Sequence, residues 1–540
     1  MIMAAAASAA LAQSAIDAQQ ISQSDFKGTA RFMSMGGAFT ALGGDLSTMN
    51  QNPAGIGIYR SNEVGATLDI NIQSTKTSPS YSGFPSSSNQ TKVYCNNFGY
   101  VGATIIPGGG ALKTFNWGAS YNRAVSFDRR YRGYVNSTNT SLSNYIAYFS
   151  QGYTSSDLSF TNDFNPYAEG ADWLSILAYN SYLINPSGSD SYNGLYQNGT
   201  VGDALYNVRE TGRVDEYNIS FGGNVENVVY WGLSVGITDL HYTRTIYYSE
   251  SMADARIYNV TGSPATTTGD AGFDLNSRKY INGSGWNLKL GVILKPMNEL
   301  RVGFAFHTPT WYHLSQGYDG TIDYSYYNPT LSDGYQMGGQ SVNPLQGYEY
   351  TDDAYFQWHY RSPWKLMAGV AAVLGKQAIL SLDYQYDSYG DMSIATPYFY
   401  DYGGWGTDFE TNEDLRADIK QYFKGTSTIR VGAEYRVTPQ FSLRAGYNYQ
   451  TSGVKAEAAE GAIEVLTSGT DPSYNFTKHM QHITCGIGYK YQNWYIDAAY
   501  VYRQREGRYH AYTNFNGNVA PQSKIVDHNS SIVLSTGFKF

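Results

Sequence analysis

Apolar and polar residues alternate with a period of two along most of the chain after residue 61. The clearest case is FSLRAGYNYQ, residues 441–450, in which Phe441 and Leu443 alternate with Ser442 and Arg444. Such alternation is typical of a strand whose two faces meet different surroundings. The predicted strands lie near residues 62–75, 93–106, 114–129, 213–226, 228–248, 279–294, 299–313, 361–374, 377–390, 425–437, 439–452, 479–490, 493–505 and 529–540.

The connections between these predicted strands alternate between short and long. Residues 225–228, 295–299 and 437–439 are typical of the short ones. The long ones span residues 76–92, 130–212, 249–278, 314–360, 391–424, 453–478 and 506–528. Outer-membrane barrels have an even number of strands, short periplasmic turns and long external loops. Residues 61–540 are therefore predicted to form an all-β transmembrane antiparallel barrel of about fourteen strands in a bacterial outer membrane.

Aromatic residues support this interpretation. Tyr and Trp, including Trp117, Trp311 and Trp494, occur near the predicted strand ends, as in the aromatic girdles of membrane barrels. A soluble sandwich is disfavoured because the opposite strand faces carry Arg and Asp, which a packed apolar core rejects. The chain ends in SIVLSTGFKF, an alternating segment with a C-terminal Phe that resembles the signal read by the outer-membrane assembly machinery.

Residues 28–57 lack this alternation and are rich in small residues. Apolar residues from Phe32 to Leu42 recur at the spacing of one helix face. A second short helix is expected with Asp45 as its cap, acting through Thr48, and with Asn52-Pro53 at its end. A barrel of fourteen strands is wider than one that side chains alone can fill. Residues 13–60 are therefore predicted to form a helical hatch inside the lumen.

The N-terminus and the overall composition narrow the choice of function. Residues 1–12 are interpreted as an export signal ending in Ala10-Leu11-Ala12, although they lack a basic segment. The net charge of −9 and the isoelectric point near 5.4 argue against a nucleic-acid partner. The two cysteines, Cys95 and Cys485, show no metal-ligand spacing, and we predict no cofactor.

Several charged residues are expected on the lumen side of the wall or on the hatch. They are Arg31, Arg301, Asp383, Arg430, Glu434, Arg444 and Asp497. They could form a polar track with carboxylate-binding arginines, or a paired network that pins the hatch to the wall. We favour the paired network because buried charges are usually paired. Arg31 is expected to face an acidic residue of the wall.

Two long loops raise further possibilities. Loop 130–212 carries apolar runs at 142–149 and 173–183, which would form either an apolar capture site over the mouth or a small core of its own. Loop 391–424 is acidic but lacks the spacing of a calcium loop. The scattered histidines have no partner nucleophile, so we predict that the protein is not an enzyme.

Three short motifs in the N-terminal segment, together with the strands that follow it, resemble those of a known protein family. The motifs Gly28-x-x-Arg31, Gly36-Gly37-Ala38 and Asn52-Pro53-Ala54, placed before fourteen strands, resemble the FadL/TodX family of outer-membrane transporters for long-chain fatty acids and hydrocarbons. The resemblance implies a hatch gated at Asn52, Pro53 and Ala54, with Gly36 and Gly37 as weaker matches. It also implies capture of a hydrophobic small molecule outside, passage beside the hatch and lateral release into outer-membrane lipid.

Two alternatives remain open at this point. The first is a FadL-like barrel that acts as a structural or secretion partner, similar to the shuttle of the type IX secretion system, with a protein partner bound at the external loops. The second is a porin for polar solutes. A porin would conduct ions steadily, whereas a plugged transporter would not.

Overall fold

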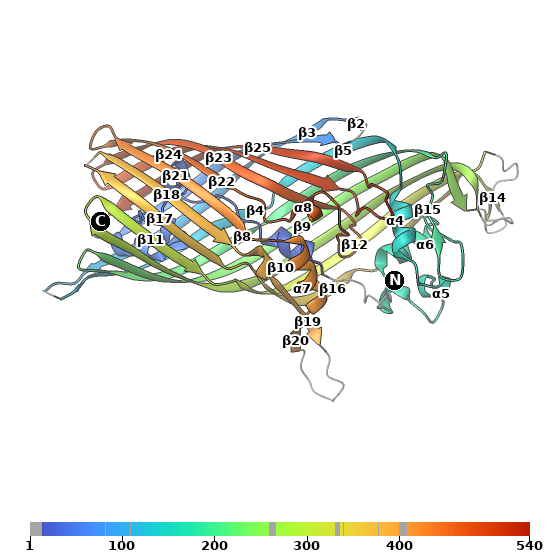
Figure 1. Cartoon of the computed structure of the whole chain (residues 1–540), viewed down its shortest axis with the longest axis horizontal. Helices are drawn as coiled ribbons and strands as arrows, with labels where there is room; N and C mark the ends of the chain where they lie inside the picture. The colour runs from blue at the N-terminus through green and yellow to red at the C-terminus, as the bar shows by residue number, and fades with distance from the viewer. Residues whose placement is uncertain are drawn as a thin grey trace.

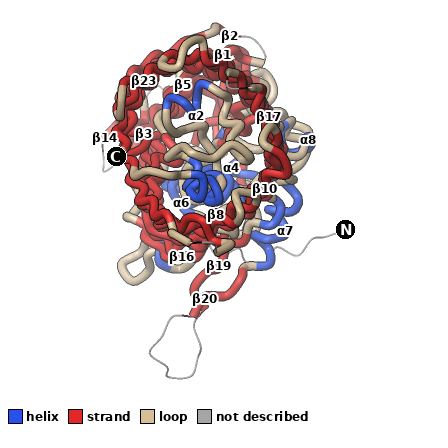
Figure 2. Tube along the Cα trace, turned by 90° about the vertical axis from the view of Figure 1, so that its left-hand side faces the viewer, coloured by secondary structure: helices blue, strands red, loops and turns tan. Residues whose placement is uncertain are grey.

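The computed structural model describes residues 13–80, 83–108, 110–258, 266–329, 335–337, 340–375, 377–398 and 408–540. The segment interpreted as an export signal, residues 1–12, lies outside the described residues. The chain forms a closed antiparallel barrel of 14 strands, as predicted, and the N-terminal segment lies inside it (Figures 1 and 2). Among the described residues, no helix has both the length and the apolar character needed to cross a bilayer.

The wall strands follow one another in chain order, and the last pairs with the first. They are β1 (Glu63–Pro79), β3 (Ser86–Ile105), β4 (Leu112–Ser126) with β5 (Arg129–Thr138), β8 (Val201–Val225), β9 (Val229–Tyr258), β10 (Thr266–Met297), β11 (Leu300–His307) with β12 (Trp311–Tyr327), β16 (Ala354–Arg361) with β17 (Lys365–Leu374), β18 (Ala378–Asp387), β21 (Thr426–Arg436), β22 (Phe441–Gln450), β23 (Tyr474–Tyr491), β24 (Trp494–His510) and β25 (Gln522–Lys539). β1 and β25 pair from Glu63 with Lys539 to Pro79 with Ser523, which closes the barrel.

Two neighbouring wall strands are interrupted by proline at similar heights. β11 and β12 both pair with β10 and are separated by residues 308–310, and β16 and β17 are separated by residues 362–364. Pro309 and Pro363 have no N–H to donate to a neighbouring strand. Each interruption is therefore a bend within one wall strand.

An apolar belt surrounds the outer face near the short turns. Exposed members include Ile70, Val93, Ile237, Leu382 and Ile483. Exposed aromatic residues border the belt on the side of the long connections, where the Trp286 and Trp311 rings lie 4.6 Å apart. This is the surface expected of a barrel in a bilayer.

The strands run well beyond this belt on the side of the long connections. β9 has 30 residues and β10 has 32, whereas about 9–11 residues cross a bilayer. Much of the ranges expected to be loops, such as 76–92 and 249–278, is therefore strand. The extra height is stabilised by buried aromatic side chains on the inner face, including Tyr206 and Tyr248.

The long connections carry most of the small elements. Loop 130–212 contains α4 (Leu142–Phe149), α5 (Ser155–Leu158), η2 (Pro166–Ala168), α6 (Trp173–Asn180), β6 (Asn185–Pro186) and β7 (Tyr192–Asn193). Its apolar runs, with Ile146 and Leu177 at their centres, pack in one core with the inner face of the extended strands. The loop therefore packs in a core that it shares with the wall strands, rather than in a small core of its own.

The remaining elements lie along the edges of the extended wall. They are β2 (Gly83–Phe84), β13 (Tyr335–Met337), β14 (Gln340–Val342), β15 (Leu345–Tyr350), η3 (Tyr389–Asp391), β19 (Ser393–Tyr398), β20 (Asp408–Thr411), α7 (Glu413–Tyr422) and α8 (Ala456–Ala459). The β19–β20 hairpin projects away from the barrel, and α7 lies at its base beside the wall (Figures 1 and 2).

Candidate functional site

The hatch is built from four short helices, α1 (Ala15–Ile21), α2 (Ala30–Ser34), α3 (Thr48–Gln51) and η1 (Pro53–Ile58). Looking along the barrel axis, α2 lies within the ring of strands (Figure 2). The helix expected to reach Leu42 ends at Ser34, because Gly36 and Gly37 adopt positive φ values of 63° and 76°.

The second helix starts later than its expected cap but ends as predicted. α3 starts at Thr48 and ends at Gln51, directly before Asn52-Pro53. The Asp45 carboxylate accepts hydrogen bonds from the Thr29 hydroxyl at 2.7 Å and from the Ser47 backbone N–H at 2.9 Å. It therefore fastens the two halves of the hatch together.

Asn52 fixes the hatch to itself and to the wall. Its Nδ2 donates to the Thr40 carbonyl at 2.6 Å and to the Phe304 carbonyl at 3.3 Å, and its Oδ1 accepts from the Ala54 N–H at 3.1 Å. The side chain is fully buried. The next residue, Pro53, begins η1. Ala54 packs with wall residues Tyr230 and Ile293.

Glycines of the wall allow the hatch main chain to approach closely. A Cβ at Gly232 would lie 2.2 Å from the Pro53 carbonyl, and one at Gly446 would lie 2.2 Å from the Gly36 nitrogen. The Gly36 N–H also donates to the Thr484 hydroxyl at 3.2 Å. The hatch therefore lies against the wall itself, with no side chain between them at these points.

Four of the seven charged residues expected in the lumen form one chain of ion pairs. Arg31 of the hatch lies 2.9 Å from Glu434, Glu434 lies 2.8 Å from Arg444, and Arg444 lies 2.5 Å from Asp497. The Glu434 and Arg444 side chains are almost fully buried. Because Arg31 belongs to the hatch and the others to the wall, these ion pairs join the two parts.

The other three residues also face the lumen but contact different groups. Arg301 donates to the Leu42 carbonyl at 2.7 Å, and the Asp383 carboxylate accepts from the Thr40 N–H at 2.7 Å. Arg430 donates through Nη2 to Gln385, while its Nη1 has no hydrogen-bond partner among the described residues. Two of the three therefore hold the hatch main chain.

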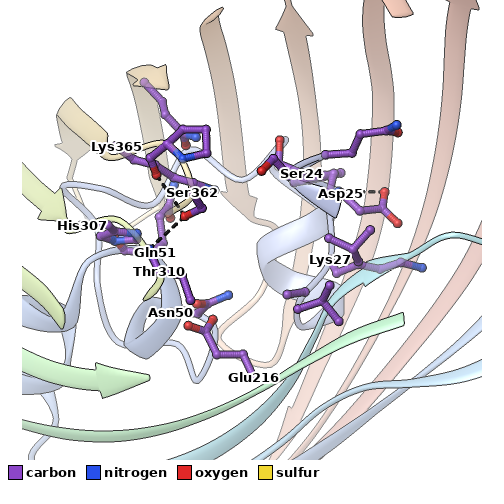
Figure 3. Close-up of a pocket in the computed structure, with 18 of the residues that line it drawn as sticks. Ser24, Asp25, Lys27, Asn50, Gln51, Glu216, His307, Thr310, Ser362 and Lys365 are labelled. Atoms are coloured by element: carbon purple, nitrogen blue, oxygen red, sulfur yellow. Dashed lines mark hydrogen bonds between the residues drawn. The ribbon is translucent and has the colours of Figure 1, made fainter. Parts of the chain in front are cut away.

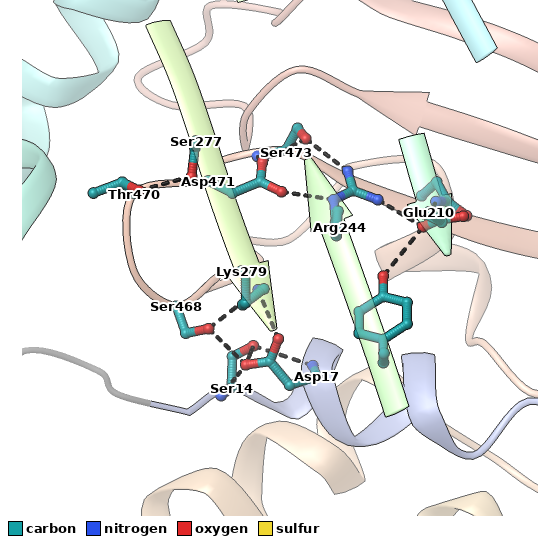
Figure 4. A network of polar contacts seen from close by, with 12 residues as sticks. Ser14, Asp17, Glu210, Arg244, Ser277, Lys279, Ser468, Thr470, Asp471 and Ser473 are labelled. Atoms are coloured by element: carbon teal, nitrogen blue, oxygen red, sulfur yellow. Dashed lines mark hydrogen bonds and ion pairs between the residues drawn. The ribbon is translucent and has the colours of Figure 1, made fainter. Parts of the chain in front are cut away.

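A second set of buried ion pairs joins α1, β8, β9, β10 and the segment before β23 (Figure 4). Asp17 of α1 lies 2.7 Å from Lys279, and Arg244 lies 2.6 Å from Asp471 and 2.8 Å from Glu210. All five side chains are buried. Buried ion pairs thus join inner segments to the wall at two places. Sequence reasoning missed this network because its members lie on strands and loops far apart in the chain and form no motif.

A cavity of about 210 Å³ lies between the N-terminal segment and the wall (Figure 3). One part of its lining is apolar and includes Phe26, Val125 and Met480. Another part carries Lys289 and Lys365, which come from neighbouring regions of the wall. The cavity therefore offers an apolar surface and a cationic surface to one bound molecule.

Some charged and polar groups around this cavity have an ion-pair or hydrogen-bond partner, and others have none among the described residues. Lys289 lies 2.7 Å from Glu216, whereas the Lys365 ammonium forms no ion pair or hydrogen bond within the described parts of the chain. Buried His482 leaves Nδ1 without a hydrogen-bond partner among the same residues. Burial opposes ionisation of Asp25, but Arg503 and Lys27 outweigh it and lower the pKa of this carboxyl to about 2. Asp25 is thus an anion already paired by cations.

The wall has a gap in its backbone pairing beside the cavity. β3 pairs with β4 from Asn97 opposite Asn122 to Ile105 opposite Thr114. Residues 86–96 of β3 pair with no strand but β1 in the described structure, while β5 pairs with β8 and β2. We name the boundary between residues 86–96 and β4–β5 the seam.

Side chains bridge the seam where main-chain pairing is missing. The Tyr94 hydroxyl donates to the Asp128 carboxylate at 2.8 Å, and Gln90 donates to the Asp128 carbonyl at 2.9 Å. The Lys27 ammonium of the N-terminal segment lies 4.8 Å from the centre of the Tyr94 ring and 2.6 Å from Asp69. The seam is therefore closed by side chains, some of which belong to the N-terminal segment.

The seam lies between the cavity and the lipid-facing surface. Arg123 lines the cavity and also pairs with Asp215 at 2.6 Å. Val93, next to Tyr94 on β3, is 66% exposed, and its partner Ile70 on β1 is 36% exposed. Sequence reasoning missed the seam because alternation within a strand carries no information on where pairing with its neighbour stops.

Comparisons with known proteins agree with this architecture. A crystal structure of a Pseudomonas aeruginosa FadL homologue matches with 13% identity and a TM-score of 0.50, over 96% of this chain and 99% of that one. The Pseudomonas putida toluene transporter TodX matches at 13% identity over 96% and 99% of the two chains, with a TM-score of 0.44. No curated protein sequence matches the chain. The family model described as outer membrane protein transport protein (OMPP1/FadL/TodX) matches residues 218–538, more than half of the sequence. The chain therefore belongs to the OMPP1/FadL/TodX family of outer-membrane transport proteins.

Proposed function

We propose that this outer-membrane barrel takes up long-chain fatty acids and releases them sideways through the seam into the membrane. The observation that carries the proposal is the missing backbone pairing between residues 86–96 and β4–β5. Elsewhere in a barrel wall, passage would break a ladder of hydrogen bonds, whereas here only side chains need to move. The seam also borders both the cavity, through Arg123, and the apolar belt, through Val93.

The lining of the cavity supports a substrate with an acidic head and an apolar tail. Lys365 and Nη1 of Arg430 lack partners in the described structure, and a carboxylate would supply one. A neutral hydrocarbon would leave these cationic groups desolvated and unpaired, which is costly. TodX is described as a toluene transporter. For the present chain, the charges favour a fatty acid over an aromatic hydrocarbon.

The hatch is proposed to gate the path from the cavity. Asn52, Pro53 and Ala54 make buried contacts with the wall, and Gly36 and Gly37 form the turn that lies against Gly446 and Phe26. Strand pairing holds the wall together independently of these contacts. The hatch can therefore shift without opening the barrel.

The two alternatives fit the geometry less well. A polar-solute porin needs a continuous aqueous path through the lumen. Here the hatch and the buried ion pairs of Arg244 with Glu210 and Asp471 both obstruct that path. A secretion partner would use the external elements, and stoichiometric subunits that co-purify with the barrel would favour it. Neither alternative explains why the wall facing the lipid contains a seam that is closed by side chains instead of backbone hydrogen bonds.

The test is uptake of labelled oleate by cells that lack their own transporter. Cells with the wild-type protein should accumulate oleate, and Lys365→Ala combined with Arg430→Ala should reduce uptake about tenfold, because each lost charge-assisted hydrogen bond weakens binding. Arg416→Ala, which removes an exposed arginine of α7, serves as the control and should leave uptake unchanged. Surface labelling establishes equal amounts of each variant. No uptake by a correctly folded, surface-exposed wild-type barrel would contradict the proposal.

A further inference from the structure

A histidine lies in the apolar part of the cavity. His482 is 2% exposed, and the centre of its ring lies 4.9 Å from that of Phe26. Met480, the preceding inward residue of β23, lines the cavity beside it. Nδ1 of His482 has no hydrogen-bond partner among the described residues. Buried polar atoms are seldom left without a partner, so a polar group of a bound molecule would be stabilised at this nitrogen.

Asn448 lies beside His482 on the neighbouring strand. The two are direct register partners of β22 and β23, and Asn448 is also the register partner of Arg430 on β21. All three residues line the cavity. The Asn448 side chain is buried and makes no hydrogen bond within the described parts of the chain. We name Asn448 and His482 the polar pair. Its histidine is two strands, or about 10 Å, away from Arg430 around the wall.

The surroundings of the polar pair favour a neutral ligand group over a second carboxylate. Arg503, the register partner of His482 on β24, lies 2.9 Å from Asp25. Lys27 lies 2.6 Å from Asp69. These cations are already paired, and the Asp25 carboxylate, which lines the same cavity, would repel another anion. A neutral group that forms hydrogen bonds therefore fits the polar pair better than a charged one.

We propose that the polar pair binds a mid-chain hydroxyl, so that the preferred substrates are hydroxylated long-chain fatty acids. A neutral imidazole offers one donor and one acceptor, and a side-chain amide offers both. A hydroxyl also donates and accepts, so it can serve both residues, whereas a ketone can only accept. With the carboxylate at Lys365 and Arg430, the chain of the acid runs along the wall past His482. This preference rests on the proposed uptake of fatty acids and names the class of acid.

The experiment measures binding of oleate and of ricinoleate, which is oleate with a mid-chain hydroxyl, to the purified full-length barrel in detergent. Partition of each acid into empty micelles is subtracted. The wild type should bind ricinoleate about tenfold more tightly, because oleate leaves the polar pair without a partner. His482→Phe and Asn448→Leu should each abolish this preference. His479→Phe, on the same strand but outside the cavity lining, is the control and should keep the wild-type ratio of affinities.

The ratio of the two affinities separates recognition of the hydroxyl from a structural role of the polar pair. A variant that only distorts the cavity weakens both acids alike and leaves the ratio unchanged, and this result would overturn the proposal. Binding of the keto analogue of ricinoleate as tightly as ricinoleate itself would also overturn it. His482→Gln, which keeps a donor and an acceptor, should retain most of the preference, and the heat-resistant form on gels shows that each variant is folded.

The wild-type protein alone distinguishes this preference from the proposed function. Equal wild-type affinities for oleate and ricinoleate would overturn the role of the polar pair and leave fatty-acid uptake standing. Failure of the folded wild type to bind either acid would overturn both.

Discussion

The guanidinium of Arg123 lies 5.5 Å from the centre of the Tyr94 ring, across the seam where β3 and β4 have no backbone pairing. Arg123 also lines the cavity and pairs with Asp215, whereas Tyr94 donates to Asp128. Side chains, rather than backbone hydrogen bonds between β3 and β4, therefore close the wall at this point.

Gly291→Ala should push the hatch out of place. A Cβ at this position would lie 1.8 Å from Oδ1 of Asn52, and overpacking of this kind costs about 1–3 kcal/mol. Hydrogen exchange in residues 28–58 should accelerate, while the barrel keeps its compact, heat-resistant form on gels. Gly272 lies on the same strand, but the nearest atom to a Cβ added there is 3.7 Å away, so the Gly272→Ala variant should exchange like the wild type. Equal exchange in both variants would show that the hatch does not rest against Gly291.

Asn52→Ala should loosen the hatch without unfolding the wall. The change removes the hydrogen bonds to the Thr40 and Phe304 carbonyls and leaves the buried Thr40 carbonyl and the Ala54 N–H without this partner, at about 1–3 kcal/mol each. Hydrogen exchange should accelerate in residues 28–58 and stay unchanged in the wall strands. If the variant lost its heat-resistant form, the hatch would be part of the folding core and our division of the chain into hatch and wall would be wrong.

Glu434→Gln should detach Arg31 from the wall. The Glu434 side chain is 4% exposed and pairs with both Arg31 and Arg444. Its neutralisation leaves partly exposed Arg31 without an ion pair and buried Arg444 with Asp497 alone, at about 1–3 kcal/mol. Protease cleavage within the hatch should become measurable. Glu413→Gln breaks the exposed pair with Arg416, where about 0–1 kcal/mol is expected, and serves as the control. Equal protease resistance of the two variants would mean that the ion pairs do not anchor the hatch.

The stability of α7 should depend on pH through Asp418. Burial, together with nearby Asp414 and Glu464, raises the pKa of Asp418 to about 6. A carboxyl whose pKa is raised by folding binds its proton more tightly in the folded state, so its stabilising contribution is complete below pH 3.8 and is lost as the pH rises through 6. Hydrogen exchange in residues 413–422, corrected for its intrinsic pH dependence, should therefore be slower at pH 5 than at pH 7.5. Asp418→Asn should abolish this difference, and a difference that persists in that variant would assign it to another group.

The sequence was sufficient to predict the barrel, its strand number and the hatch within it. Alternation such as that of residues 441–450 is set by two different environments, and the alternation of short and long connections is set by the two sides of a membrane. The length of the strands was underestimated because β9 and β10 continue above the membrane, where buried tyrosines occupy inward positions that resemble a polar loop.

The features that depend on register could not be predicted. The Arg31–Glu434 pair was one of several charge pairings open to Arg31, and the partners of Arg244 lie in β8 and in the segment before β23. The seam results from where the pairing of β3 and β4 stops at Asn97, which no residue pattern marks. Side-chain periodicity reports the two faces of a strand and not its neighbours.

Photocrosslinking of labelled oleate during uptake tests the central claim most directly. A photoreactive phenylalanine analogue replaces either Tyr94, at the seam, or Tyr495, which lines a cavity of about 300 Å³ on the other side of the hatch. Lateral release predicts that oleate crosslinks at position 94 and not at position 495. Crosslinking at 495 without crosslinking at 94 would show that substrate passes along the barrel axis, and it would contradict release through the seam.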